Sequence, residues 1–139
     1  MSRRSRRRRE GEKGQSLVEF ALVVPIFLLL VFAIIDFGFG FHAWLTVTNS
    51  AREGARIGAV RATAADIEQR VRNTTDSLDQ ADLSVVVTNA QGASGSSVVV
   101  EVEYEYELIT PLDSIMGMIS GGSIGPTLTF TSTADMRLE

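Results

Sequence analysis

Four glutamates alternate with apolar residues in VVVEVEYEYEL, residues 98–108, and form the densest group of side chains that could do chemistry. On a β-strand they would share one face, where neighbours lie roughly 7 Å apart, too far to hold one divalent cation at about 2.3–2.6 Å without ligands from other loops. We therefore predict a solvated acidic face that discourages wrong strand pairing, with a contact to a basic partner surface as the alternative. The four residues are Glu101, Glu103, Glu105 and Glu107.

The residues that catalysis usually needs are otherwise sparse. The chain has no cysteine and one histidine, His42, which excludes thiol nucleophiles, disulfides and Cys-based metal sites. It contains neither a phosphate-binding GxxxxGK[ST] loop nor a GxSxG motif followed by a suitably placed histidine and acid. The sequence therefore predicts a protein that is not an enzyme and that has no metal site and no cofactor.

A further glutamate stands where a carboxylate is expensive. Glu19 lies near the start of GQSLVEFALVVPIFLLLVFAI, residues 14–34, and Asp36 is the only other charged residue between Leu17 and Leu45. A carboxylate at the edge of hydrocarbon costs on the order of a few kcal/mol, so its position calls for a reason. One reason would be ordinary: at a helix end, the side chain can snorkel to the headgroups.

The same segment has the composition of a membrane span, which we place at about residues 17–45 with aromatic residues near its outer boundary. Residues 1–14 carry seven basic and two acidic side chains, a net charge of +5, whereas the remainder carries six and fifteen, a net charge of −9. The positive-inside rule then predicts a cytoplasmic basic leader, a single pass through the cytoplasmic (inner) membrane and an extracytoplasmic C-terminal part. A cleaved secretory signal and a nucleic-acid-binding arm are the disfavoured alternatives, because the apolar stretch is too long for a signal and no recognition element accompanies the arginines.

Beyond the span the helix is expected to continue unbroken, so that one helix covers residues 15–62 and measures on the order of 70 Å. Small residues recur along it at helical spacing, which allows another helix to approach closely. This small-residue face comprises Val47, Ser50, Ala51, Gly54, Ala55, Gly58 and Ala59. We expect its part from Ser50 to Ala59 to make contacts between subunits.

We predict that residues 63–139 form a small extracytoplasmic domain. Thr63-Ala64-Ala65-Asp66 has the form of a capping box, so a second helix should begin there and fade near Ser77. The fold class is therefore α+β: a long N-terminal transmembrane helix, a short second helix and a small antiparallel sheet of about three strands. The strands are expected at residues 83–88, 98–108 and 127–139, with an irregular or briefly helical excursion at residues 111–126.

Gly14, Glu19 and Phe20 together form the pattern GxxxxE[YF] at the start of the apolar segment. This pattern resembles the type IV prepilin processing site, in the form seen in Flp-type pilins and their pseudopilins. The wider stretch, with VEFAL, Pro25, Asp36-Phe37-Gly38 and NSAREGAR, is similar to the TadE-like family of pseudopilins, from the tight-adherence branch of type IV pilus systems. The resemblance covers residues 11 to about 60.

The resemblance implies processing and assembly. A membrane prepilin peptidase would cut between Gly14 and Gln15, where a residue without a Cβ lets the backbone fit a protease cleft. Glu19 would pair with the N-terminal amine of a neighbouring subunit, which offsets the cost of a carboxylate in apolar surroundings, and Pro25 would kink or loosen the helix. The expected site residues are Gly14 and Gln15 for cleavage, Glu19, Phe20 and Pro25 for processing and assembly, and Asn49, Ser50, Ala51, Arg52, Glu53, Gly54, Ala55 and Arg56 for helix packing and the family motif.

The functional hypothesis is thus a TadE-like pseudopilin or minor pilin, a structural component in the assembly of a tight-adherence (Flp, type IVb-like) pilus. Its expected partners are the prepilin peptidase, other pilin and pseudopilin subunits, the pilus assembly platform and membrane lipid, but no nucleic acid. It would form homo- or hetero-oligomers through the long helix. The alternative is a signal-anchored single-pass membrane protein whose extracytoplasmic domain binds a partner or ligand.

Overall fold

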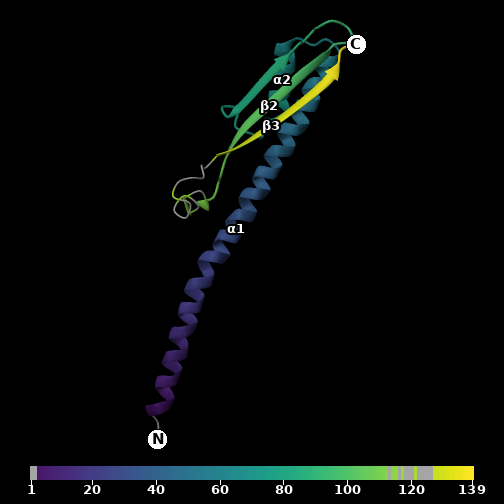
Figure 1. Ribbon diagram of the computed structural model, residues 1–139. Helices are drawn as coiled ribbons and strands as arrows, with labels where there is room; N and C mark the ends of the chain where they lie inside the picture. Colours follow the sequence, from purple (N-terminus) through teal and green to yellow (C-terminus); the bar gives the residue numbers. More distant parts are fainter. Residues whose placement is uncertain (1–2, 113, 116, 118–120, 122–126) are drawn as a thin grey trace.

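One long helix organises the structure. The computed structural model describes residues 3–112, 114–115, 117, 121 and 127–139, with side chains from residue 14 onward. A three-stranded antiparallel sheet lies along the C-terminal half of the helix, whereas the N-terminal half extends away from every other element (Figure 1). The elements are α1 (Arg3–Ala59), α2 (Ala64–Thr74), β1 (Leu83–Thr88), β2 (Ser97–Glu107) and β3 (Thr127–Arg137). The predicted α+β fold is confirmed.

The long helix runs without a break through the apolar segment and into the domain, as the sequence predicts. It ends at Ala59, three residues before the expected position. Arg61 adopts φ 65°, and its N–H donates to the carbonyl of Gly58 at 3.0 Å while the N–H of Ala62 donates to that of Ile57 at 3.4 Å. A left-handed residue with this pair of hydrogen bonds satisfies the last carbonyls of a helix and turns the chain away.

The second helix begins at the capping box. The backbone N–H of Asp66 donates to the Thr63 hydroxyl at 3.1 Å, and the N–H of Thr63 donates to the Asp66 carboxylate at 3.3 Å. These reciprocal bonds satisfy two donors that a helix start otherwise leaves free. The helix ends at Thr74, slightly before the expected Ser77, because Thr75 caps it with its side chain buried.

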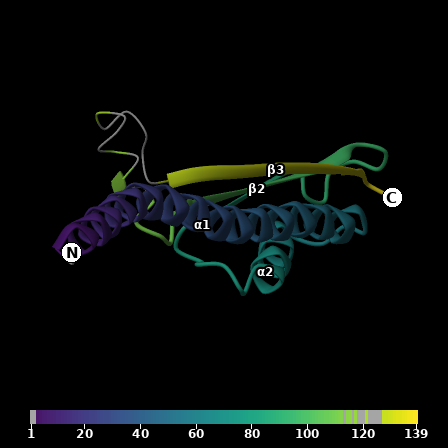
Figure 2. The ribbon, with the colours of Figure 1, turned by 90° about the horizontal axis from the view of Figure 1, so that it is seen from below.

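The sheet has the order β1-β2-β3, with β2 in the centre. Alternation along β2 is as the sequence predicts, since every second residue from Val98 to Tyr106 is buried. On the other face three of the four glutamates are exposed, and Val99 and Glu103 are half-buried. Figure 2 shows the layers that result: the sheet covers one side of α1, and α2 packs against α1 on the side away from β3. The buried side chains of β2 are Val98, Val100, Val102, Tyr104 and Tyr106.

The third strand is less buried than expected. The alternation of apolar residues with threonines in residues 127–139 predicts an inward face that includes Leu128 and Met136, but these side chains are 49% and 37% exposed. β3 is an edge of the sheet among the described strands and lies over the flank of α1, so only the middle of the strand is covered. Leu138, which follows the strand, is buried. Most of the expected excursion at residues 111–126 lies outside the described residues.

The small-residue face of α1 is covered by the chain itself, which corrects the expectation that this face makes contacts between subunits. Val47, Ser50, Ala51 and Ala55 are fully buried. A Cβ placed on Gly54 would lie 2.8 Å from Cγ2 of Val71 on α2 and 3.1 Å from Cγ1 of Val100 on β2. Small residues are needed here because α2 and the sheet approach the helix at the same level.

Gly54→Ala is expected to destabilise the domain by about 1–2 kcal/mol. Alanine favours a helix by about 0.5–1 kcal/mol, but the new methyl group meets two stiff, β-branched side chains, and overpacking costs about 1–3 kcal/mol. The matched control is Gly38→Ala on the same helix, where no described atom lies within 4 Å of the added Cβ. Urea unfolding in detergent micelles measures both; equal stabilisation by the two substitutions would contradict the packing.

Candidate functional site

The expected processing residues lie together on a free helical surface. Gly14, Gln15, Glu19 and Phe20 are all exposed on α1. The side-chain amide of Gln15 donates to Oε1 of Glu19 at 3.1 Å, one helical turn away. The carboxylate of Glu19 therefore lies beside the residue whose amine would become the new N-terminus after cleavage. This is a local geometry that the chain provides without any partner.

Glycine at position 14 is not required by packing. A Cβ at Gly14 would meet no described atom within 4 Å. Glycine within a helix costs roughly 0.5–1 kcal/mol relative to alanine.

The helix between this site and the sheet exposes apolar side chains on all sides. None of the most apolar 18-residue stretch within Gly14–Ala59 is buried, so this part of α1 is not the core helix of a soluble domain. Pro25 lies within it, and the helix continues on both sides. The most exposed members are Leu17, Phe20, Leu22, Val23, Ile26 and Ile34, each more than 60% exposed.

Asp36 joins the helix to the sheet, a role that the sequence did not reveal. Its side chain is 3% exposed. Oδ1 accepts hydrogen bonds from the backbone N–H groups of Ile109 at 2.9 Å and Thr110 at 3.2 Å, and Oδ2 accepts one from the Thr110 hydroxyl. Three donors from the segment after β2 thus satisfy the carboxylate. The only signal in the sequence was a charged residue inside an otherwise apolar stretch.

Tyr106 reinforces this junction from β2. Its hydroxyl donates to the backbone carbonyl of Asp36 at 3.3 Å. Burial, and then the nearby Asp36 carboxylate, raise the pKa of Tyr106 above its ordinary value, so the phenol stays protonated and remains a donor.

The NSAREGAR motif forms a second junction, between α1 and α2. Glu53 accepts from Arg56 one turn further along α1 and from Arg70 on α2, with both shortest contacts at 2.7 Å. Hydrogen bonds from these two guanidinium groups lower the pKa of Glu53 to about 2. The motif therefore alternates buried small residues with one carboxylate that links the two helices. Asn49, Arg52 and Arg56 are exposed.

Acid is expected to weaken this link. Because the folded-state pKa of Glu53 lies below its ordinary value of 4.5, its stabilising contribution is complete above pH 4.5 and is lost as the pH falls towards about 2. Other carboxylates titrate in the same range, so the comparison is with Glu53→Gln. Thermal melting from pH 6 to pH 2 should show that the variant loses less stability than the wild type. Parallel pH dependences for the two proteins would contradict the assignment.

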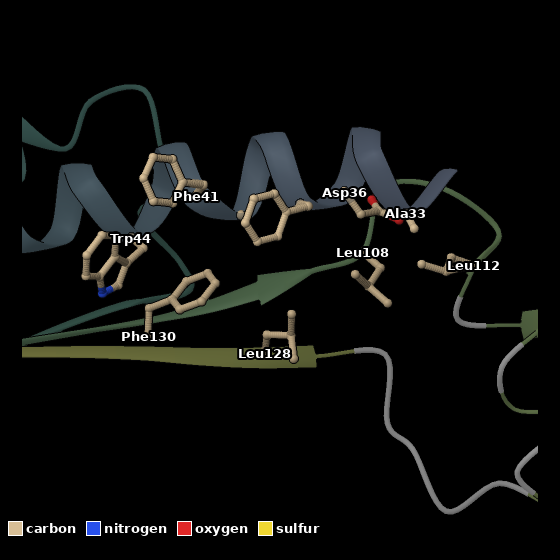
Figure 3. Close-up of a pocket in the computed structure, with 10 residues that line it drawn as sticks. Ala33, Asp36, Phe41, Trp44, Leu108, Leu112, Leu128 and Phe130 are labelled. Atoms are coloured by element: carbon tan, nitrogen blue, oxygen red, sulfur yellow. The ribbon is translucent and has the colours of Figure 1, made fainter. Parts of the chain in front are cut away.

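An apolar groove opens between α1 and β3, beside Asp36 (Figure 3). Its volume is about 380 Å³. Figure 3 shows Trp44 of α1 and Phe130 of β3 next to each other at one end, with Leu128 and Leu108 towards the Asp36 end. Gly40 lies beside both aromatic rings of the neighbouring strands, since a Cβ there would lie 3.5 Å from the Phe130 and Tyr106 rings. The lining residues are Ala33, Asp36, Phe37, Gly40, Phe41, Trp44, Leu108, Leu112, Leu128 and Phe130.

The acidic strand borders a smaller and more polar pocket of about 220 Å³, lined by Ala81, Asp82, Leu83, Ser84, Glu103 and Glu105. Glu101, Glu105 and Glu107 are exposed on β2, as expected for a solvated face. Within the described part of the chain, no group of three or more His, Cys, Asp or Glu side chains is arranged to hold a metal ion.

Together, the free apolar helix and the small α+β domain carried on its end define a membrane-anchored protein. Residues 14–56 match the family model described as TadE-like protein, so the resemblance seen in the sequence is confirmed over this segment. This family is associated with the Tad pilus and is of a structural rather than an enzymatic type. The comparisons with curated proteins and with solved structures found no match.

The matched segment contains the α1 side of both junctions described above. It begins at Gly14, includes Asp36 and ends at Arg56. It therefore contains the exposed helix and the face of α1 on which the domain is built, whereas α2 and the three strands lie outside it.

Proposed function

We propose that this protein is a pseudopilin or minor pilin of a Tad (Flp-type) pilus, inserted with its N-terminus in the cytoplasm and processed between Gly14 and Gln15. The observation that carries the proposal is the family match, whose first residue is the glycine of the GxxxxE[YF] pattern. The protein works by assembly and not by catalysis. Its partners are a prepilin peptidase, other pilin-type subunits and the assembly platform.

Two features of the helix support processing. Gly14 fills no packing role, so its type is explained by a protease that needs backbone access. Gln15 and Glu19 are already in contact through their side chains, so cleavage would create a positive amine within reach of a carboxylate. Once both groups leave water, pairing them avoids the large cost of an uncompensated buried charge.

The burial of the small-residue face changes which surface is available for assembly. Subunit contacts through α1 are made by its exposed apolar part, around Glu19, Phe20 and Pro25. The small residues Ser50, Ala51 and Ala55 are not available for such contacts because they are buried. A bundle of such helices from several subunits would bury these side chains as a core is buried.

The test is the N-terminal sequence and mass of the full chain after coexpression with a prepilin peptidase. We expect a mature protein that begins at Gln15. Gly14→Val should retain the leader, because a branched side chain blocks the cleft while the helix has room for it. Gly38→Ala, on the same helix, should be cleaved normally. A wild-type chain that keeps its leader under these conditions would refute processing.

A further inference from the structure

The apolar groove between α1 and β3 begins at the depth where the membrane must still be present. From Phe20, the first residue after Glu19, a span of about 30 Å at 1.5 Å per residue reaches Phe39. Ala33, Asp36 and Phe37 line the groove and fall within that span. The sheet therefore starts alongside the helix before the helix has left the hydrocarbon.

The position of β3 along the helix follows from two contacts. The Phe130 ring lies beside Gly40, and Tyr106, which pairs with Leu128, reaches the backbone of Asp36. Leu128 is thus level with Asp36, about 7 Å closer to the membrane than Phe130. A strand residue that is 49% exposed at this depth faces lipid if it does not face another protein.

The chemistry of the groove fits hydrocarbon. Asp36 is the only ionisable residue among its described lining, and its carboxylate is already satisfied by Ile109 and Thr110. The aromatic side chains of α1 form a row that runs along the groove away from Asp36. The ring centroids of Phe37 and Phe41 are 6.1 Å apart, and those of Phe41 and Trp44 are 5.6 Å apart. Aromatic rings of this kind gather at the boundary between hydrocarbon and headgroups.

We propose that the groove is a lipid-binding surface: the rim of the domain formed by Leu108, Leu112 and Leu128 dips into the bilayer that α1 spans, and the groove holds acyl chains. In the unassembled protein its surface is continuous with the exposed apolar side chains of the spanning helix, so lipid rather than a second protein borders it. A buried Asp36 is tolerated at this depth because the domain supplies its hydrogen bonds. The proposal requires a membrane anchor but neither cleavage nor a pilus, so it can fail or hold independently of them.

The experiment places single tryptophans in the full-length protein. Trp44 is the only tryptophan of the chain, so Trp44→Phe removes the native signal. Leu128→Trp in that background reports on the groove, and Leu112→Trp is a second reporter should the first variant not fold. The control is Val86→Trp on β1, with 54% exposure similar to that of Leu128. Through the strand register Val86 is level with Thr133, about 17 Å further from the membrane than Leu128.

Each variant is reconstituted at high dilution in phosphatidylcholine vesicles that carry a nitroxide on the headgroup, at acyl carbon 5 or at acyl carbon 12. We expect Leu128→Trp to lose emission most strongly with the headgroup and carbon-5 labels, and Val86→Trp to lose none with either acyl label. Native Trp44 should respond mainly to the headgroup label. If acyl labels quench the groove reporters no more than Val86→Trp, the groove faces water or a second copy of the chain, and the proposal is wrong.

Discussion

Asp36→Ala is expected to loosen the junction between the membrane helix and the sheet and to destabilise the protein by about 2–4 kcal/mol. The substitution leaves the N–H groups of Ile109 and Thr110 and the Thr110 hydroxyl without their acceptor, and each buried donor left unsatisfied costs about 1–3 kcal/mol. Loss of a desolvated carboxylate offsets part of this cost. Urea unfolding in micelles measures the loss in the free energy of unfolding. Amide hydrogen exchange at residues 109 and 110 shows whether that loss arises at this junction.

The control is Asp36→Asn, which keeps the size of the side chain. Its carbonyl can still accept from both backbone N–H groups, and its amide can donate to the Thr110 hydroxyl. We therefore expect a loss of about 1 kcal/mol and preserved protection of the two amides. Unchanged exchange at residues 109 and 110 in Asp36→Ala would show that the junction does not depend on this carboxylate.

Glu19→Ala is expected to leave membrane insertion and peptidase cleavage intact but to abolish incorporation into the assembled pilus or its platform. The Glu19 side chain is exposed on the helix, so its loss changes the fold little. Between subunits it would face a neighbour's N-terminal amine in apolar surroundings. Breaking a pair of this kind costs enough to reduce incorporation by roughly a hundredfold or more.

Two variants separate charge from polarity at this position. Glu19→Gln keeps the side-chain contact with Gln15 possible but removes the charge, so it should fail to incorporate as Glu19→Ala does. Glu19→Asp keeps the charge and should retain part of the function. The measurement is the ratio of subunit in sheared pili or in the isolated platform to subunit in the membrane. Normal incorporation of Glu19→Ala would reduce Glu19 to a helix-end residue that snorkels to the headgroups.

Local patterns predicted the elements of this fold well. Alternation in residues 98–108 gave β2 and its buried face, and the four residues from Thr63 to Asp66 gave the start of α2, because both signals act over a few neighbouring residues. The ends of elements were less accurate. Thr75 and Arg61 end their helices through hydrogen bonds and dihedral angles that residue type alone did not indicate.

Contacts between distant segments were not predictable in the same way. The small residues around Gly54 indicate a close approach but do not say whether the approaching helix belongs to the same chain, and here it is α2. Asp36 finds its donors more than 70 residues later in the sequence. The groove depends on β3 being an edge strand displaced towards the flank of α1, which no periodicity encodes.

Because α1 is continuous, the directions in which Glu19 and Asp36 project from the helix axis have a fixed angle between them. Asp36 points at the sheet, and Glu19 lies 17 residues earlier on the same helix. At roughly 100° per residue, an undistorted helix places Glu19 about a quarter turn away from the side that carries the sheet. A neighbouring subunit that binds Glu19 would therefore also fix the rotation of the sheet about the helix axis. A single ionic contact near one membrane surface would in this way orient a domain about 25 Å away. Pro25, which lies between them, is the point at which that torsional coupling can be adjusted.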